Sequence, residues 1–142
     1  MSNTVKAALA GLAAAAMLAP GFAAARPAEL GEPMLSILYP ATNPETGEPT
    51  QFDIDYYRDH HLTLIMDLYG DSISRFELIK PAEMPEGMPP AQYVAVVNIY
   101  IADQSAFDAA QAEHGATLVA DVPNFSNVQP MVTQGVIYGL DD

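Results

Sequence analysis

The chain has 142 residues, of which 18 are acidic and 5 are basic, so its formal net charge is −13. A surface this acidic repels phosphate backbones and anionic lipids, and we therefore expect no nucleic-acid partner and no membrane partner. The sequence contains no cysteine, which excludes disulfide bonds, thiolate nucleophiles and cysteine-ligated clusters. Its length is sufficient for one domain with a hydrophobic core.

The first 25 residues are typical of a secretory signal peptide. Lys6 is the only charged residue in 1–25, and residues 7–19 are almost entirely alanine, leucine and methionine. A proline and a glycine end this run, and three alanines then offer a small-residue cleavage site. The run is shorter than the roughly 20 residues of a transmembrane helix; an alanine-rich N-terminal helix is the alternative. We expect export to the periplasm or secretion, with residues 26–33 as a lead-in and 34–142 as the domain.

Hydrophobic periodicity predicts four strands and two helices in the order β-α-β-β-α-β. The strands are expected at residues 34–39, 73–80, 93–101 and 131–138, and the helices at residues 52–70 and from an Asp103 cap to about residue 120. For the first helix, either Thr50 or Asp53 is a suitable N-cap. This order predicts a ferredoxin-like α+β fold, in which two helices cover one face of a four-stranded antiparallel sheet.

The predicted strands are apolar on both faces, which indicates a homodimer. In residues 93–101, for example, Ala95 and Val97 alternate with Val94 and Val96. A sheet with one face in water alternates cleanly between apolar and polar residues. Because two helices can cover only one face, we expect a second copy of the chain to cover the other.

The helix predicted at residues 52–70 carries a histidine on its apolar face. Tyr57 precedes His61 by four residues and Leu64 follows it by three, which is helical spacing. A buried imidazole needs a hydrogen-bond partner, a metal or a ligand, because an unpaired buried polar group costs about 1–3 kcal/mol. The helix therefore carries either a satisfied core histidine or part of an active site, with Leu64 and Ile65 as the neighbouring pocket residues.

The second predicted helix carries another histidine, His114, on the same face as Phe107 and Leu118. Because the two helices lie side by side in a ferredoxin-like fold, we expect both imidazoles to project into one apolar cavity. His61, His114 and Tyr57 are then a candidate acid–base set. The alternative is that each histidine bonds a backbone carbonyl and fills its end of the core.

Other polar residues are interpreted as structural. His60 lies about 100° around the helix from His61, so we expect it to be exposed, and adjacent histidines make a poor metal chelate. Asp121 either orients His114, lines the pocket mouth, or is a turn residue before Pro123; we favour the turn. The sequence has no glycine-rich phosphate-binding motif, which excludes a Rossmann-type nicotinamide site.

Three segments together form a recognisable pattern: residues 38–40 read LYP, residues 52–64 read FDIDYYRDHHLTL and residues 114–125 read HGATLVADVPNF. They resemble the EthD family, named for a protein associated with ethyl tert-butyl ether degradation. The second segment is similar to the family's Y-Y-x-x-x-H-x-P-L, and the third resembles its H-x-x-x-x-x-x-D-x-P-N-[YF]. By this pattern His61 and His114 hold the family's two histidine positions. Thr63 departs from the pattern, because it stands where the family usually has proline.

The resemblance implies a dimeric α/β barrel, in which two ferredoxin-like subunits join their sheets, and an oxidoreductase or reductase label. We expect a small exported enzyme that acts on a small apolar or aromatic substrate between helices and sheet. His61 would be the general base or acid, with His114 assisting. We predict no cofactor, so the reaction would be a cofactor-independent oxidation, or an isomerisation, cyclisation or dehydration. The alternatives are a non-catalytic carrier of a small ligand or haem, and a purely structural dimer.

Overall fold

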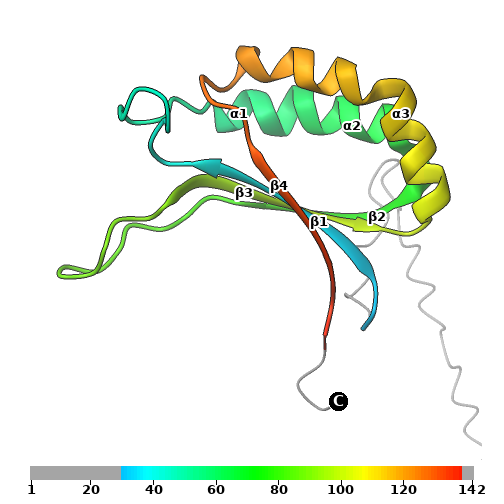
Figure 1. The fold of residues 1–142 in the computed structure, drawn as a ribbon, viewed down its shortest axis with the longest axis horizontal. Helices are drawn as coiled ribbons and strands as arrows, with labels where there is room; N and C mark the ends of the chain where they lie inside the picture. The colour runs from blue at the N-terminus through cyan, green and yellow to red at the C-terminus, as the bar shows by residue number, and fades with distance from the viewer. Residues whose placement is uncertain (1–29, 139–142) are drawn as a thin grey trace, which may run out of the picture.

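Two helices cover one face of a four-stranded sheet in the computed structural model, which describes residues 30–138 (Figure 1). The strands are β1 (Pro33–Pro40), β2 (Ile73–Ile79), β3 (Tyr93–Ile101) and β4 (Met131–Val136), and the two longest helices are α2 (Leu62–Tyr69) and α3 (Gln104–Asp121). The signal peptide expected at residues 1–25 lies outside the described residues. No helix within 30–138 is long and apolar enough to cross a membrane.

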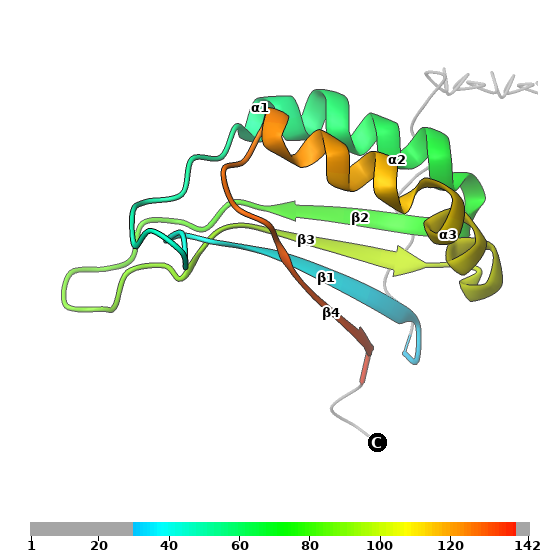
Figure 2. The ribbon, with the colours of Figure 1, turned by 45° about the horizontal axis from the view of Figure 1, so that its top comes forward.

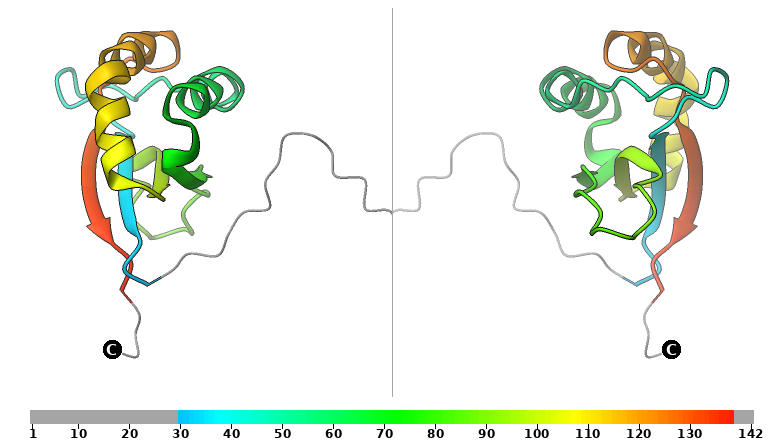
Figure 3. Two further views of the ribbon diagram at one scale, coloured as in Figure 1. Left: turned by 90° about the vertical axis from the view of Figure 1, so that its right-hand side faces the viewer. Right: turned by 90° about the vertical axis from the view of Figure 1, so that its left-hand side faces the viewer.

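The sheet has the strand order β2-β3-β1-β4, and each neighbouring pair is antiparallel. Ile37 at the centre of β1 is paired with Val97 of β3 and Val132 of β4. Figures 2 and 3 show α2 and α3 side by side over the same face of this sheet. The ferredoxin-like α+β prediction is confirmed, and the strand bounds differ from the predicted ones by two residues at most.

The first predicted helix begins as expected but is interrupted by a wide turn. Asp53 is the N-cap, and its carboxylate accepts a hydrogen bond from the Tyr56 N–H at 2.9 Å. The single turn α1 (Ile54–Tyr56) passes into a π-helical turn, Tyr57–His61, before α2 begins. In this wide turn the Leu62 N–H bonds the Tyr57 carbonyl, five residues back. The prediction of one regular helix over residues 52–70 is therefore wrong at this turn.

The wide turn keeps four residues spaced by four on one buried face. Tyr57, His61, Ile65 and Tyr69 are each 5% exposed or less. In a regular α-helix a spacing of four drifts by about 40° at every step, because 3.6 residues complete a turn. A π-helical turn holds more residues than an α-helical turn, so it absorbs part of this drift. Of the two residues predicted to follow His61 on the inward face, Ile65 is therefore buried and Leu64 is only half-buried.

Helix α3 begins at an aspartate cap and is followed by a turn that contains a proline. The Asp103 side chain accepts a hydrogen bond from the Ala106 N–H at 2.9 Å, which confirms the predicted cap. At its other end α3 continues into a 3-10 turn, Val122–Asn124, that contains Pro123. Only Phe107 and Gly115 of α3 are fully buried, so this helix covers the sheet with a narrow face.

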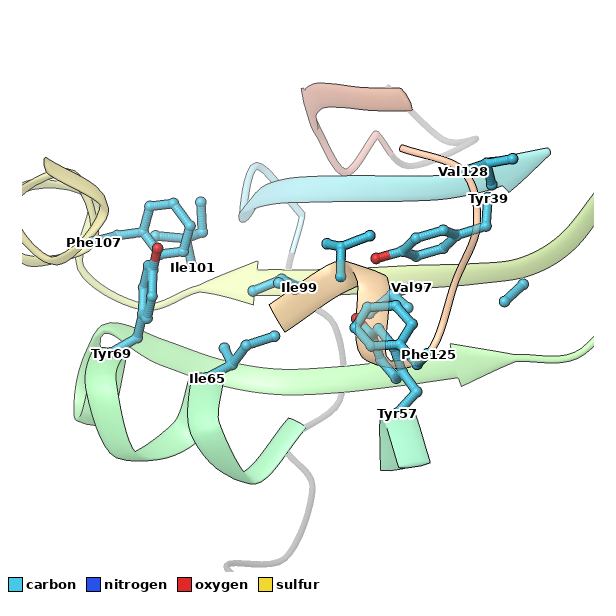
Figure 4. Packing of buried hydrophobic residues seen from close by; sticks show 12 residues of the cluster. Tyr39, Tyr57, Ile65, Tyr69, Val97, Ile99, Ile101, Phe107, Phe125 and Val128 are labelled. Atoms are coloured by element: carbon cyan, nitrogen blue, oxygen red, sulfur yellow. The ribbon is translucent and has the colours of Figure 1, made fainter. Parts of the chain in front are cut away.

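Aromatic side chains fill the two ends of the core, and aliphatic side chains lie between them (Figure 4). At one end the rings of Tyr57 and Phe125 lie 5.0 Å apart, with Tyr39 beside them. At the other end the rings of Tyr69 and Phe107 lie 5.1 Å apart. Ile65, Val97 and Ile99 occupy the middle of this core.

Replacing Tyr57 by phenylalanine should stabilise the protein. The Tyr57 side chain is fully buried and its hydroxyl has no hydrogen-bond partner within the described structure. We expect Tyr57→Phe to raise the free energy of unfolding by about 1 kcal/mol, because it removes an unpaired buried polar group. Urea denaturation measures the change.

Tyr69→Phe is the matched control, because the Tyr69 hydroxyl donates to Gln111 Oε1. This variant should lower the free energy of unfolding by about 1 kcal/mol. A lower stability for Tyr57→Phe would contradict the assignment of an unpaired hydroxyl at Tyr57.

Candidate functional site

Two distant segments of the chain meet at the start of the first helical region. The Asp53 N–H bonds the Phe125 carbonyl at 2.8 Å, and the Gln51 N–H bonds Asn127 Oδ1 at 2.9 Å. These bonds hold the chain entering α1 against the chain leaving α3. Side chains at residues 56–61 and 121–125 are therefore brought into contact.

His61 and Asp121 form the central polar pair of this junction. His61 Nδ1 lies 2.7 Å from Asp121 Oδ2, and the imidazole side chain is 5% exposed. The other carboxylate oxygen, Oδ1, accepts hydrogen bonds from the Tyr56 hydroxyl at 3.0 Å and from Asn124 Nδ2 at 2.8 Å. Because both oxygens are bonded, the carboxylate is fixed, and it fixes the plane and position of the imidazole in turn.

The surroundings of the pair define its protonation state. Burial lowers the pKa of His61, and the Asp121 carboxylate opposes this shift without cancelling it. Burial raises the pKa of Asp121, but the hydrogen bonds from His61, Asn124 and Tyr56 outweigh burial and hold this pKa below its usual value. At neutral pH Asp121 is therefore an anion and His61 is neutral.

The tautomer of His61 follows from this arrangement. An ionised carboxylate can only accept hydrogen bonds, so Nδ1 of His61 carries the proton. Nε2 then carries the lone pair, and no residue within 30–138 hydrogen-bonds this nitrogen. A neutral imidazole with a free Nε2 and a carboxylate behind Nδ1 has the arrangement of a general base.

A cavity of about 310 Å³ lies between the two helices and the sheet, and His61 lines it. Its lining is mostly aliphatic and aromatic, with contributions from Ile37 and Ile99 of the sheet and from Ile65 and Leu118 of the helices. The volume is at the lower end of the range for small-molecule sites, about 300–1,000 Å³. The site can therefore hold a small apolar molecule against a basic nitrogen.

Two tyrosines lie near His61 and have different positions. The ring of Tyr57 lies 4.9 Å from the imidazole, but Tyr57 does not line the cavity. Tyr39, from β1, does line it, and burial raises the pKa of its hydroxyl. Together with Phe125, whose ring lies 4.7 Å from that of His61, Tyr57 supports the imidazole from outside the cavity. Tyr57, predicted as part of the acid–base set, thus lies beside His61 but outside the cavity lining.

The expectation that His114 shares a cavity with His61 is wrong. The His114 side chain is 29% exposed, and its Nε2 lies 3.6 Å from the neighbouring Glu113 carboxylate. Gly115 takes the inward position and lines the cavity instead. Successive helical residues are about 100° apart, so an inward residue 115 turns residue 114 toward the helix edge. The structure brings His61 together with Asp121 and not with His114.

The remaining predicted residues divide in the same way. Ile65 lines the cavity, whereas Leu64 is half-buried and does not line it. His60 is exposed as expected, and its ring lies 4.8 Å from that of Tyr56. Asp121 does end α3 before the turn, as the favoured interpretation expected, but its carboxylate also bonds His61. Within residues 30–138 no group of three or more histidine, aspartate and glutamate side chains could hold a metal ion.

A model of the family described as the EthD domain matches residues 45–129. The chain belongs to the EthD family. An EthD-like protein from Ralstonia eutropha JMP134 has the same fold, with a TM-score of 0.65 and 23% identity over 80% of this chain and 100% of that one. An ethyl tert-butyl ether degradation family protein from Bacillus halodurans C-125 has a TM-score of 0.54 and 15% identity, over 75% and 98%. No curated protein matches the sequence.

Stability of this EthD protein should fall as the pH decreases below about 6.5, the ordinary pKa of histidine. Because the pKa of His61 is lowered in the folded state, the unfolded chain binds more protons in this range. The contribution of His61 to the free energy of unfolding is thus fully present above pH 6.5. It is lost as the pH falls toward the pKa that His61 has in the folded state. Urea denaturation between pH 7.5 and pH 5 measures this loss.

Two variants test whether His61 causes this loss of stability with decreasing pH. His61→Phe should lose less stability than the wild type over the same range, because it has no imidazole to protonate. Asp121→Asn should lose more per pH unit, since the carboxylate that opposes the shift is gone. Identical slopes for all three proteins would contradict the assignment of a neutral His61.

Proposed function

We propose that this EthD protein is an enzyme that binds a small apolar or aromatic molecule in the cavity, and that His61 transfers a proton to or from it. One observation carries the proposal: the buried His61 has its Nδ1 bonded to Asp121 and its Nε2 without a partner, at the wall of an apolar cavity. The substrate would lie against Ile65 and Ile99 with its acidic C–H or O–H near Nε2.

The chemistry follows from the protonation state. Nε2 takes a proton from the substrate, and His61 becomes an imidazolium whose positive charge lies 2.7 Å from the Asp121 carboxylate. The apolar surroundings strengthen this attraction, because charges interact more strongly in a low dielectric. The imidazolium then returns the proton to another atom of the substrate. An isomerisation, cyclisation or dehydration requires these two proton transfers in succession.

The same first step serves the oxidation that the family's oxidoreductase label suggests. Removal of a proton leaves an electron-rich anion, which would give two electrons and a second proton to dioxygen; with the first proton returned from His61, the dioxygen would leave as hydrogen peroxide. Tyr56 and Asn124 act as positioning residues, because both donate to the carboxylate that orients His61. Their hydrogen bonds keep Asp121 ionised and so keep the proton of His61 on Nδ1.

Replacement of His61 and Asp121 tests the proposal on a substrate found by screening small phenols, enols and ketones. We expect His61→Ala to lower kcat by about 100-fold or more, the usual contribution of a general base. Asp121→Asn should also lower kcat, and it should move the acid limb of the pH–rate profile to lower pH, since the anion that raises the imidazole pKa is lost.

His114→Ala is the matched control, because His114 lies at the helix edge and does not line the cavity. This variant should have the kcat of the wild type. Full turnover by His61→Ala would overturn the assignment of His61. A wild-type protein that releases every bound compound unchanged would instead be a carrier.

The protein is further proposed to be a homodimer joined through the face of the sheet that the helices leave uncovered. This outer face carries a polar network at its centre: Ser36 Oγ donates to Asn98 at 2.8 Å, and Asn98 Nδ2 and the Tyr100 hydroxyl donate to Glu77 at 3.2 and 2.9 Å. Apolar side chains surround the network, including Leu38, Ile79, Val94, Val96 and Met131. An apolar face with a satisfied polar centre is suited to burial against its own copy.

Native mass spectrometry of protein recovered from its export pathway tests dimerisation and export together. We expect twice the mass of a chain that begins near Arg26. Val96→Asp should give the monomer mass, because it would bury an unpaired charge in the interface. Thr117→Asp, on the exposed side of α3, is the control and should remain dimeric. A wild-type monomer would contradict the proposed interface, and a full-length mass would contradict cleavage after residue 25.

A further inference from the structure

The cavity has a second polar end, which Tyr69 and Gln111 form. Both residues line the cavity, Tyr69 from the last position of α2 and Gln111 from the middle of α3. The buried Tyr69 hydroxyl donates its hydrogen to Gln111 Oε1 at 2.5 Å. Gln111 is otherwise exposed to solvent, so this bond holds its amide at the mouth of the cavity.

The amide nitrogen of Gln111 is a free hydrogen-bond donor. No residue among those described accepts a hydrogen bond from Nε2. The nitrogen lies over Gly115, so closely that a Cβ at residue 115 would clash with it. Gly115 is buried and also lines the cavity. The glycine therefore gives the amide room to lie against α3, where its N–H groups meet whatever the cavity holds.

The two polar ends are separated by the length of α2. This helix has eight residues between the wide turn that holds His61 and the end at Tyr69. At about 1.5 Å per residue, His61 and Tyr69 lie about 12 Å apart along the helix axis. Figure 4 shows Ile65 and Ile99 between the end at Tyr39 and the end at Tyr69 and Phe107. The space is thus long and apolar in its middle and polar at both ends.

A carboxylate restricts the chemistry of the second end. Asp108 lines the cavity three residues before Gln111, and its Oδ1 accepts a hydrogen bond from Gln104 Nε2 at 2.7 Å. A negative group on a ligand would be repelled there, whereas a neutral oxygen would not. The second end therefore suits a carbonyl, hydroxyl or ether oxygen that accepts a hydrogen bond from Gln111.

From this geometry we propose that the cavity selects elongated, neutral, apolar molecules with an oxygen function at each end, one facing His61 and the other bonded to Gln111 Nε2. The His61 end rests on the proposed function. Gln111 takes no part in the reaction and determines specificity. It recognises the oxygen remote from His61 and so determines the orientation in which the ligand binds. A fused two-ring aromatic with oxygens at opposite ends has this chemistry.

Three probes of one ring system test the inference by isothermal titration calorimetry: naphthalene, 2-naphthol and 2,6-dihydroxynaphthalene. We expect the diol to bind the wild type about five-fold more tightly than 2-naphthol, the worth of about one additional hydrogen bond. In the double variant Tyr69→Phe/Gln111→Leu the diol and 2-naphthol should bind alike, because neither position then offers a donor for the second oxygen; the single variant would free the Tyr69 hydroxyl to donate to it.

Gln92→Leu is the matched control, since Gln92 is exposed and lies outside the cavity; it should keep the five-fold difference. Thermal melts of each variant establish that it is folded. A diol that binds the wild type no better than 2-naphthol, or a difference that survives in the double variant, would overturn the inference and leave the proposed function intact. Failure of all three probes to bind would overturn the apolar pocket itself, and with it the proposed function.

Discussion

The hydrogen bond between His61 and Asp121 is the contact on which the rest of the site depends. It joins side chains 60 residues apart in sequence, one in the wide turn before α2 and one at the last position of α3. An imidazole this deeply buried is stable only with a partner, because an unpaired buried polar group costs about 1–3 kcal/mol. Loss of either side chain would therefore disturb both helices as well as the chemistry.

Nearby backbone hydrogen bonds and turns hold His61 and Asp121 together. The bonds from residues 51 and 53 to residues 125 and 127 hold the two chain segments in register. The 3-10 turn with Pro123 ends α3 where Asp121 meets His61, and it places Asn124 on the second carboxylate oxygen. The wide turn supplies the last element, because it keeps His61 in line with Ile65 and Tyr69 on the cavity side. Such π-helical turns occur frequently at functional sites.

Local sequence signals predicted the elements of the fold but not the exact facing of its helices. The strands are rich in β-branched residues, so they could be predicted from the sequence. The starts of the helices could be predicted as well, because Asp53 and Asp103 are caps that act within one helical turn. The residues that each helix buries could not be predicted from the sequence as well as the elements themselves. The wide turn was not predicted from residues 57–61, and of the two predicted pocket residues Leu64 and Ile65 only Ile65 lines the cavity. On α3 the inward position went to Gly115, which has no side chain to mark it as buried.

Asp121 shows why a site is harder to predict than its scaffold. An aspartate before Pro123 is ordinary turn chemistry, and only the tertiary structure places its carboxylate against His61. The available signal was the spacing of Asp121 and Asn124 three residues apart, which puts both side chains on one side of a helical end. That spacing indicates a shared partner but does not name it. Because His114 stands closer to Asp121 in sequence, sequence distance favoured the wrong histidine.

The position of β4 connects the cavity to the proposed dimer. This strand is an edge of the sheet, and all six of its residues are exposed. Two of them, Val132 and Gln134, line the cavity on the helix side, while Met131 and Thr133 alternate toward the outer face. One wall of the binding site is thus the least supported strand of the structure. Burial of the outer face against a second copy would hold that wall in place, so the proposed assembly and the proposed ligand binding would stabilise the same strand from its two sides.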